Sequence, residues 1–222
     1  MNDNPRLFLG YDQREAVGFH VCVQSILEKA KRFPVSITPI SGERRDGTND
    51  FIYARFLVPY LCNFEGWALF IDGSDMLLRE DIGDLWCLRD GSKAIQVVKQ
   101  DYAPRSPRKY IGTRMESDNS AYPRKNWSSV MLINCSHPLH RALTPQFVAA
   151  CSGSHLHRFA WLPDELVGEL PSKWNVLVGE LGETGECAIA HFTLGIPAMP
   201  HYHSCLHSGE WWKTLDRMKR FD

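Results

Sequence analysis

Short stretches of apolar residues alternate along the chain with stretches in which apolar residues recur at helical spacing. Continuous apolar runs bounded by turn residues predict strands, and recurrence every three or four residues predicts amphipathic helices. The predicted strands cover residues 6–11, 35–40, 67–71, 94–100, 130–135 and 187–193, and the predicted helices cover 12–31, 51–61 and 209–221. Strands that are apolar throughout and alternate with helices are typical of a parallel sheet covered on both faces. The pattern therefore predicts an α/β fold with a mostly parallel central sheet flanked by helices.

Two segments carry local signals of their own. Asp12 followed by Glu15 is a capping-box pattern for the first helix. Residues 103–125 are rich in Pro, Arg, Lys and Ser and contain no predicted element. Because a loop of that length inside a compact domain is usually functional or mobile, we predict a mobile loop there.

Length and composition narrow the classes of protein. The 222 residues suffice for a single domain over 1–222 that needs no disulfide or zinc to build a core. The 25 basic and 26 acidic side chains leave no charge excess, which argues against nucleic acid as a partner held by bulk attraction. No apolar run approaches the ~20 residues that span a bilayer, and the N-terminus lacks a signal-peptide pattern. The seven scattered cysteines without a C-x-x-C pair favour reduced thiols and a cytoplasmic location.

Polar residues stand at the ends of three predicted strands. They are Tyr11-Asp12, the Asp72 and Asp75 of an Asp-Gly-Ser-Asp turn, and His191 within the last strand. Ligands of open α/β sheets bind outside the carboxyl ends of the strands, so these are candidate site residues. Two carboxylates on one turn and a distant imidazole offer the oxygen and nitrogen ligands that suit Mn²⁺ or Mg²⁺. The alternative is a turn in which Asp72 and Asp75 only cap backbone N–H groups.

The residues around this turn resemble a known enzyme family. FIYARFLVPYL and then WALFIDGSDMLLREDIGDLW provide, in order, an Arg-containing helix, a strand ending in paired aspartates, a later Asp and a Leu-Trp pair. This order is similar to the metal-binding region of GT-A fold nucleotide-sugar glycosyltransferases, especially the family of glycogenin and the lipopolysaccharide galactosyltransferases. LGYDQREA, NWSSVMLINC, LPSKWNVL and AHFTLGIP extend the resemblance over most of the chain. The chain resembles a compact bacterial or phage type of that family.

The resemblance implies a fold, a reaction and a set of site residues. The fold is a Rossmann-like GT-A domain with a nucleotide-binding half, 1–100, and an acceptor half, 101–222. The reaction is metal-dependent transfer of a hexose from a nucleotide sugar, first of all a UDP-sugar. The acceptor is an unidentified saccharide, lipid-linked molecule or protein. A homo-oligomer is a possible state of the chain. The implied catalytic residues are Arg55 and Asp164, with Glu165 as the alternative to Asp164. The implied donor-binding residues are Tyr11, Asp12, Arg55, Asp72, Ser74, Ser128 and Ser129. The implied ligands of Mn²⁺ or Mg²⁺ are Asp72, Asp75 and His191.

Two positions depart from the family pattern. The carboxylates are Asp-x-x-Asp rather than Asp-x-Asp, so either Asp72 reaches the metal through a bulged turn or Ser74 stands nearer its place. The family's lysine for the donor diphosphate follows the terminal histidine, whereas the corresponding stretch here reads GIPAMP. His201, His203, Lys213 or the basic 103–125 loop are the candidate replacements, and that loop is also a candidate lid over the donor.

Other interpretations remain open for the same residues. Structural alternatives are a helix cap at Asp12, a surface ion pair at Arg55 and a buried neutral histidine at His191. The HYHSCLH segment could chelate zinc as a strand, although its spacing matches no common structural-zinc pattern. For the whole chain, FIDGSD superficially resembles haloacid dehalogenase-like phosphohydrolases, and the missing lysine suits a non-catalytic module that binds a nucleotide sugar or carbohydrate.

Overall fold

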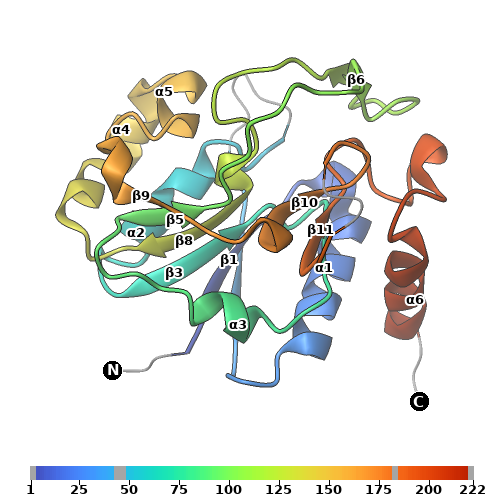
Figure 1. Ribbon diagram of the computed structural model, residues 1–222, viewed down its shortest axis with the longest axis horizontal. Helices are drawn as coiled ribbons and strands as arrows, with labels where there is room; N and C mark the ends of the chain where they lie inside the picture. Colours follow the sequence, from blue (N-terminus) through green and yellow to red (C-terminus); the bar gives the residue numbers. More distant parts are fainter. Residues whose placement is uncertain (1–3, 43–48, 182–184, 220–222) are drawn as a thin grey trace.

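A six-stranded sheet forms the centre of the molecule in the computed structural model, which describes residues 4–42, 49–181 and 185–219 (Figure 1). Its strands are β1 (Arg6–Gly10), β2 (Ser36–Ile40), β3 (Trp67–Ile71), β5 (Ile95–Val97), β8 (Val130–Asn134) and β9 (Val167–Glu169). They lie in the order β2-β1-β3-β8-β5-β9. All neighbours are parallel except β8, which is antiparallel to both β3 and β5. The predicted α/β fold with a mostly parallel sheet is confirmed.

The other described strands form two small sheets. One contains β10 (Val176–Leu177), β11 (Ile189–His191) and β4 (Met76–Leu78), and the other pairs β6 (Arg108–Lys109) with β7 (Ser117–Asp118). The α-helices are α1 (Ala16–Lys29), α2 (Val58–Leu61), α3 (Ile82–Trp86), α4 (Pro145–Ala150), α5 (Gly153–His157) and α6 (Ser208–Met218). Short 3₁₀ helices cover Gln13–Glu15, Ala54–Leu57, Trp127–Ser129, Pro138–Ala142, Asp164–Leu166, Ser172–Asn175 and Pro200–Tyr202.

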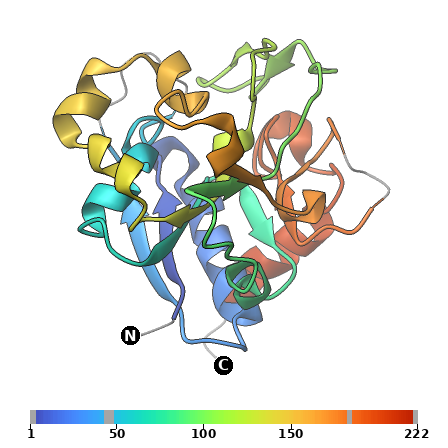
Figure 2. The same cartoon turned by 60° about the vertical axis from the view of Figure 1, so that its left-hand side comes forward.

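The two faces of the sheet are covered by different segments. Alternate side chains of a strand point to opposite faces. Phe8 and Phe70 accordingly belong to one apolar cluster, whereas Leu7 and Leu69 belong to another. The first cluster includes residues of α2, α4 and α5, and the second includes residues of α1 and α3. Figures 1 and 2 show α4 and α5 on the side of the sheet away from α1 and α6.

Three segments differ from the elements that the sequence predicts. The helix predicted over 51–61 is divided into the 3₁₀ helix Ala54–Leu57 and α2, because Pro59 fits only in a first helical turn. The 103–125 segment contains the β6–β7 hairpin, which its composition does not predict. The HYHSCLH segment begins in the 3₁₀ helix Pro200–Tyr202 and continues in turns, so it is not a strand.

The first helix begins with a different cap from the predicted capping box. Asp12 does cap, because its side chain accepts from the backbone N–H of Arg14. Glu15, however, does not bond back to the Asp12 N–H, which instead donates to the hydroxyl of Ser74. Glu15 is buried, and the capping box is therefore wrong in its second half. The physical reason is a tertiary contact between the end of β1 and the turn after β3.

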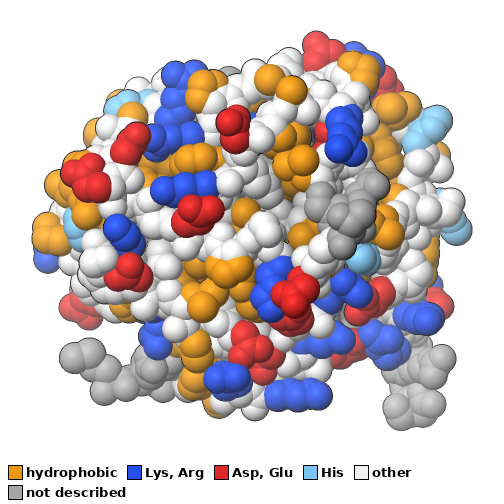
Figure 3. Space-filling model, in the orientation of Figure 1, with side chains coloured by type: hydrophobic (Ala, Val, Ile, Leu, Met, Phe, Trp, Pro, Cys, Tyr) orange, Lys and Arg blue, Asp and Glu red, His pale blue; other side chains and the backbone are white. Residues whose placement is uncertain are grey.

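The charged side chains are mixed on the surface. On the face shown in Figure 3, basic and acidic side chains are interspersed and do not gather into one basic patch. Among the described helices, none combines the length and the apolar character needed to cross a membrane. The cytoplasmic location, the oligomeric state and the division into two halves at residue 100 stay predictions.

Candidate functional site

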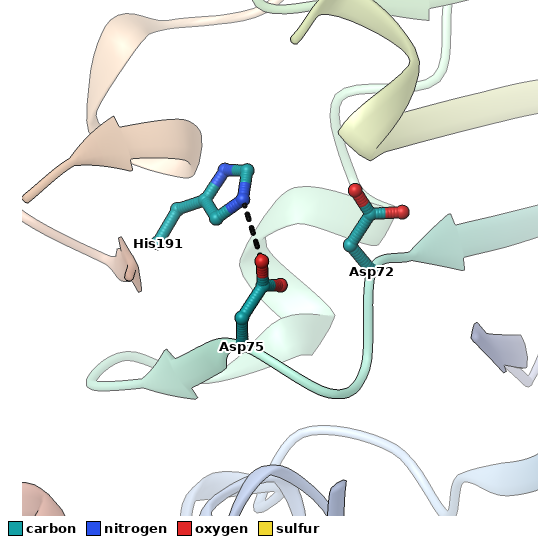
Figure 4. Close-up of side chains that lie close together, drawn as sticks. All are labelled: Asp72, Asp75 and His191. Carbon is teal, nitrogen blue, oxygen red and sulfur yellow. Dashed lines mark hydrogen bonds and ion pairs between the residues drawn. The ribbon is translucent and has the colours of Figure 1, made fainter. Parts of the chain in front are cut away.

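The turn between β3 and β4 brings two carboxylates next to a histidine of β11 (Figure 4). β4 and β11 are antiparallel, with Met76 opposite His191, so the imidazole lies beside Asp75 at the start of β4. The Nε2 atom of His191 is 3.3 Å from the Oδ2 of Asp75. Ligand atoms of Asp72, Asp75 and His191 all lie within 4.8 Å of one another, and all three residues are buried. The predicted metal ligands are therefore brought together.

The extra residue of the Asp-x-x-Asp turn is accommodated by Ser74. Its hydroxyl accepts from the Asp12 N–H (3.2 Å) and donates to the Gly10 carbonyl (3.4 Å), so it points back toward β1. Helix α1 lies so close that a Cβ on Gly18 would be 2.1 Å from the Ser74 carbonyl oxygen. Of the two arrangements that the spacing allows, the turn that carries Asp72 to the cluster is the one observed. The hydroxyl of Ser74, which the resemblance predicts to bind the donor, is instead directed toward β1.

The carboxylates carry more negative charge than their neighbours neutralise. A guanidinium nitrogen of Arg55 lies 2.7 Å from Asp72, and both side chains are buried. Burial, with the nearby charge of Asp75, raises the pKa of Asp72 to about 6 against the opposing effect of Arg55. The Oδ1 of Asp75 is buried and has no hydrogen-bond partner among the described residues. A divalent cation would satisfy this oxygen and offset the charge repulsion, so the residues fit a metal site.

The alternative interpretation of the turn does not fit the contacts. Among the hydrogen bonds of the described residues, no backbone N–H donates to the carboxylate of Asp72 or Asp75. Arg55 is likewise not in a surface ion pair, because only 3% of its surface is exposed. It also donates to the Ser128 carbonyl (3.0 Å) and lies over the rings of Phe51 and Phe70.

Asn175 fixes the orientation of the His191 ring. Its amide nitrogen donates to the Asn126 carbonyl (3.0 Å), which leaves its oxygen 2.8 Å from the Nδ1 of His191. Since that oxygen can only accept, Nδ1 carries a proton, and Nε2 is the ring nitrogen that faces Asp75 and is left for a metal. Such a partner holds a metal-binding histidine in the required tautomer. Asn175 lies in LPSKWNVL, a segment that the sequence singled out only through its resemblance to the family.

Replacing Asn175 with Leu is expected to weaken Mn²⁺ binding about 10–100-fold, because the ring loses the acceptor that sets its tautomer. Asn175→Asp keeps an acceptor at that place and is expected to retain most of the affinity. Titration of Mn²⁺ followed by electron paramagnetic resonance, on variants whose circular dichroism matches the wild type, measures the difference. Equal affinities of the Leu variant and the wild type would contradict a role for Asn175.

A cavity of about 510 Å³ opens over the three ligands, and it is within the size range of small-molecule sites. The predicted residues that line it are Arg55, Asp72, Asp75, Ser128, Ser129 and His191. The sequence interpretation missed Lys109, Tyr110, Lys125 and His157 as individual lining residues. Only the basic composition of residues 103–125 pointed toward the two lysines.

Ser128 and His157 form a neutral polar pair in the cavity wall. The Ser128 hydroxyl is 2.7 Å from the Nδ1 of His157. Burial, together with the charge of Arg55, lowers the pKa of His157 to about 3, so the imidazole is uncharged near neutral pH. Its Nε2 is buried and has no hydrogen-bond partner among the described residues. The pair can exchange hydrogen bonds with hydroxyl groups of a ligand.

Other predicted site residues do not line the cavity. Asp12 is paired with Arg14 and accepts from the Asp50 N–H (3.1 Å). Tyr11 packs edge-on against Phe19. The side chain of Asp164 is 80% exposed and paired with Arg124, so its position gives no support to a catalytic role. Glu165 is also exposed, and the roles of these residues stay predictions.

Two alternative chemistries find no support in the described residues. The metal-ligating group that these residues form is Asp72, Asp75 and His191, and it includes no residue of HYHSCLH. His203 of that segment instead packs against the ring of Trp212. A phosphohydrolase with Asp72 as nucleophile would need an acid two residues later, where Ser74 is buried beneath the turn.

The sequence and the fold are both similar to known proteins. The chain is 37% identical to Protein CDI of Arabidopsis thaliana over 232 aligned residues, covering 97% of this chain and 87% of that protein. The fold is similar to galactosyltransferase LgtC in complex with donor and acceptor sugar analogs, with a TM-score of 0.62, 14% identity, and coverage of 98% of this chain and 97% of that one. It is also similar to glycosyltransferase GlyE of Streptococcus pneumoniae TIGR4, with a TM-score of 0.62 and 13% identity. That similarity covers 96% of this chain and 60% of GlyE. No family model matches. The comparisons confirm the resemblance at the level of the fold, which is that of known glycosyltransferases.

Proposed function

The chain belongs to the family of Protein CDI of Arabidopsis thaliana, and from its GT-A fold and its site we propose that it is a metal-dependent glycosyltransferase. The proposed reaction transfers a hexose from a nucleotide sugar, first of all a UDP-sugar, to a saccharide, lipid-linked or protein acceptor. The observation that carries the proposal is the buried Asp72, Asp75 and His191 cluster at the wall of a cavity of ligand size. It lies at the end of a parallel strand, where open α/β sheets bind their ligands.

Asp72, Asp75 and His191 would hold the metal. A bound Mn²⁺ or Mg²⁺ supplies Lewis acidity that stabilises negative charge on a diphosphate leaving group. The mixed oxygen and nitrogen ligands suit either ion, and Mn²⁺ is the ion that we propose. Asn175 already holds the His191 ring with Nε2 toward the cluster, so metal binding requires no rotation of the ring.

The remaining lining residues orient the donor. Arg55 keeps Asp72 charged and in place, and its guanidinium lines the cavity where hydroxyl groups of the donor can reach it. Ser128 and His157 offer neutral hydrogen-bonding groups to the hexose. Because these groups are fixed by packing before the donor enters, little order has to be gained on binding.

Calorimetry with the intact chain tests the proposal. We expect UDP and a UDP-hexose to bind in the presence of Mn²⁺ and to bind far more weakly after chelation of the metal. A panel with UDP-, GDP- and CMP-linked sugars identifies the nucleotide. Absence of binding by every member of the panel with Mn²⁺ present would refute the proposal.

A non-catalytic binding module of the same fold is the second candidate. The observation in its favour is the position of Asp164, which leaves the cavity without the acidic residue that the resemblance implies close to the sugar. This candidate predicts metal-dependent donor binding without transfer and without slow hydrolysis of the donor. Release of UDP from the bound donor, measured over hours, separates the two.

A further inference from the structure

The β6–β7 hairpin carries one of its basic residues into the cavity. β6 and β7 are antiparallel, with Arg108 opposite Asp118 and Lys109 opposite Ser117. Successive residues of a strand point to opposite sides. Arg108 does not line the cavity and pairs with Glu116 and with Asp118, whose exposed carboxylate is part of the cavity lining, whereas Lys109 lines the cavity with Asp72 and Asp75.

The segment that follows His191 holds the hairpin in place. The backbone N–H of Tyr110 donates to the Leu194 carbonyl (2.6 Å), and that of Ile111 donates to the Tyr202 hydroxyl (3.2 Å). The ring of Tyr110 is buried in an apolar cluster with Phe192 and Met199. The hairpin therefore packs on the stretch in which the resembled family carries its lysine and this chain has GIPAMP.

The base of the hairpin has a second attachment. The carboxylate of Glu180, which is fully buried, accepts from the backbone N–H groups of Arg105 (2.6 Å) and Ser106 (3.3 Å). The side-chain amide of Asn119 donates to the same carboxylate (2.9 Å). Two attachments, one on each side of Lys109, fix where its ammonium group enters the cavity.

The Lys109 ammonium has no close counter-charge. Among the described residues, no carboxylate lies within ion-pair distance of it, and its recorded close contact is with the ring of Tyr110 (5.1 Å). Burial lowers its pKa, an effect that the more distant carboxylates of Asp75, Glu15 and Asp72 oppose. An ammonium left without a partner in a partly buried cavity is poised for an anionic ligand.

A second ammonium stands in the same cavity. Lys125 is buried, and its Nζ donates to the Ser120 carbonyl (2.9 Å). Burial and the positive charge of Lys109 lower the pKa of Lys125 to about 8. The two lysines line the same cavity and repel each other, and an anion bound near both would relieve that repulsion.

We propose that Lys109, with Lys125 beside it, binds the diphosphate of the donor and replaces the lysine that is missing after His191. This inference rests on the proposed function. The other candidates for the replacement are placed elsewhere: His201, His203 and Lys213 do not line the cavity, and Lys213 is exposed on α6. Arg124 pairs with Asp164 outside it. The hairpin thus supplies from a different segment the charge that a diphosphate needs.

The test compares the affinities for UDP and UMP, in the presence of Mn²⁺, of the wild type, Lys109→Ala, Lys109→Arg and Arg114→Ala. Arg114 lies on the same hairpin with its side chain exposed, and it does not line the cavity. Loss of a charge-assisted contact is expected to weaken UDP binding by Lys109→Ala about 10–100-fold, with a smaller loss for UMP. Lys109→Arg is expected to recover part of the UDP affinity, and Arg114→Ala is expected to bind as the wild type.

Three results would overturn the inference. Lys109→Ala could bind UDP as tightly as the wild type, or lose UDP and UMP affinity equally, or lose UDP affinity together with its native circular dichroism while Lys109→Arg recovers nothing. Each of these leaves the proposed function standing, because the wild type still binds UDP with Mn²⁺. If the wild type itself binds no nucleotide, the proposed function fails, and the inference fails with it.

Discussion

Replacing Asp75 with Asn is expected to abolish metal-dependent donor binding, with a loss of Mn²⁺ affinity of more than about 100-fold. Removing a residue that only hydrogen-bonds to a metal ligand costs up to about 100-fold in metal affinity. Because Asp75 is a proposed ligand itself, its removal should cost more. Asn has the shape of Asp but lacks its charge, so the buried turn can keep its backbone. Mn²⁺ titration and calorimetry with UDP measure the two affinities.

Thermal unfolding separates a lost ligand from a damaged fold. Without metal, Asp75→Asn is expected to be at least as stable as the wild type, because Asp75 raises the pKa of its neighbour Asp72 by repulsion. With Mn²⁺ at about 100 times the wild-type dissociation constant, the wild type gains about 2.7 kcal/mol in the free energy of unfolding, and the variant gains at most about 0.4 kcal/mol. Asp84→Asn, in an exposed pair with Arg32, is the control that keeps the gain. A variant stabilised by Mn²⁺ as much as the wild type would remove Asp75 from the metal site.

Replacing Arg55 with Met is expected to lower the free energy of unfolding by about 3 kcal/mol at neutral pH. The guanidinium lies 2.7 Å from Asp72 in buried surroundings, and removing one member of a buried pair leaves an uncompensated charge. Met fills a similar volume, so the packing against Phe51 and Phe70 changes little. Urea denaturation measures the loss.

The pH dependence of that loss identifies its cause. The pKa of Asp72 is about 6 in the wild type, above its ordinary value of 3.8, and without Arg55 it rises further. The ionised carboxylate therefore costs stability at pH values above the folded pKa, and this cost disappears as the pH falls toward the ordinary value. The difference between Arg55→Met and wild type should shrink as Asp72 protonates. A difference that is constant with pH would show that packing, rather than charge, is what Arg55 provides.

An exposed ion pair supplies the matched control. Arg32 lies 2.7 Å from Asp84, the same distance as in the buried pair, but both side chains are largely in solvent. Arg32→Met is expected to cost less than about 1 kcal/mol, because water screens the pair. Mn²⁺ binding by Arg32→Met should match the wild type, whereas Arg55→Met should bind the ion more weakly near neutral pH, where a protonated Asp72 must first lose its proton.

The β6–β7 hairpin offers a replacement for the lysine that is missing after His191. Taken alone, GIPAMP after His191 suits a protein that has lost its diphosphate site and with it the reaction. Because the Tyr110 N–H donates to the Leu194 carbonyl, the hairpin lies on that same stretch, and Lys109 lines the cavity together with the proposed metal ligands. The absence of one residue from a motif is therefore compatible with the activity when another segment supplies the charge.

The amino-acid sequence by itself predicted six of the described strands, the first helix and the three residues proposed as metal ligands. These features are local: an apolar run such as WALFI predicts a buried strand wherever the fold places it, and Asp72 and Asp75 follow that strand directly. His191 stood within its own apolar strand in the same way. The ordered motifs then indicated which of these strand ends meet.

Only the tertiary structure decided which way the other side chains point. Asn175, Lys109 and His157 are ordinary polar residues in their own segments, and they become site residues through contacts with residues far away in the sequence. Ser74 and Asp164 had the right neighbours in the sequence but point elsewhere. The physical reason is that periodicity fixes the type of an element, whereas the direction of a polar side chain depends on the partners that packing brings within hydrogen-bond distance.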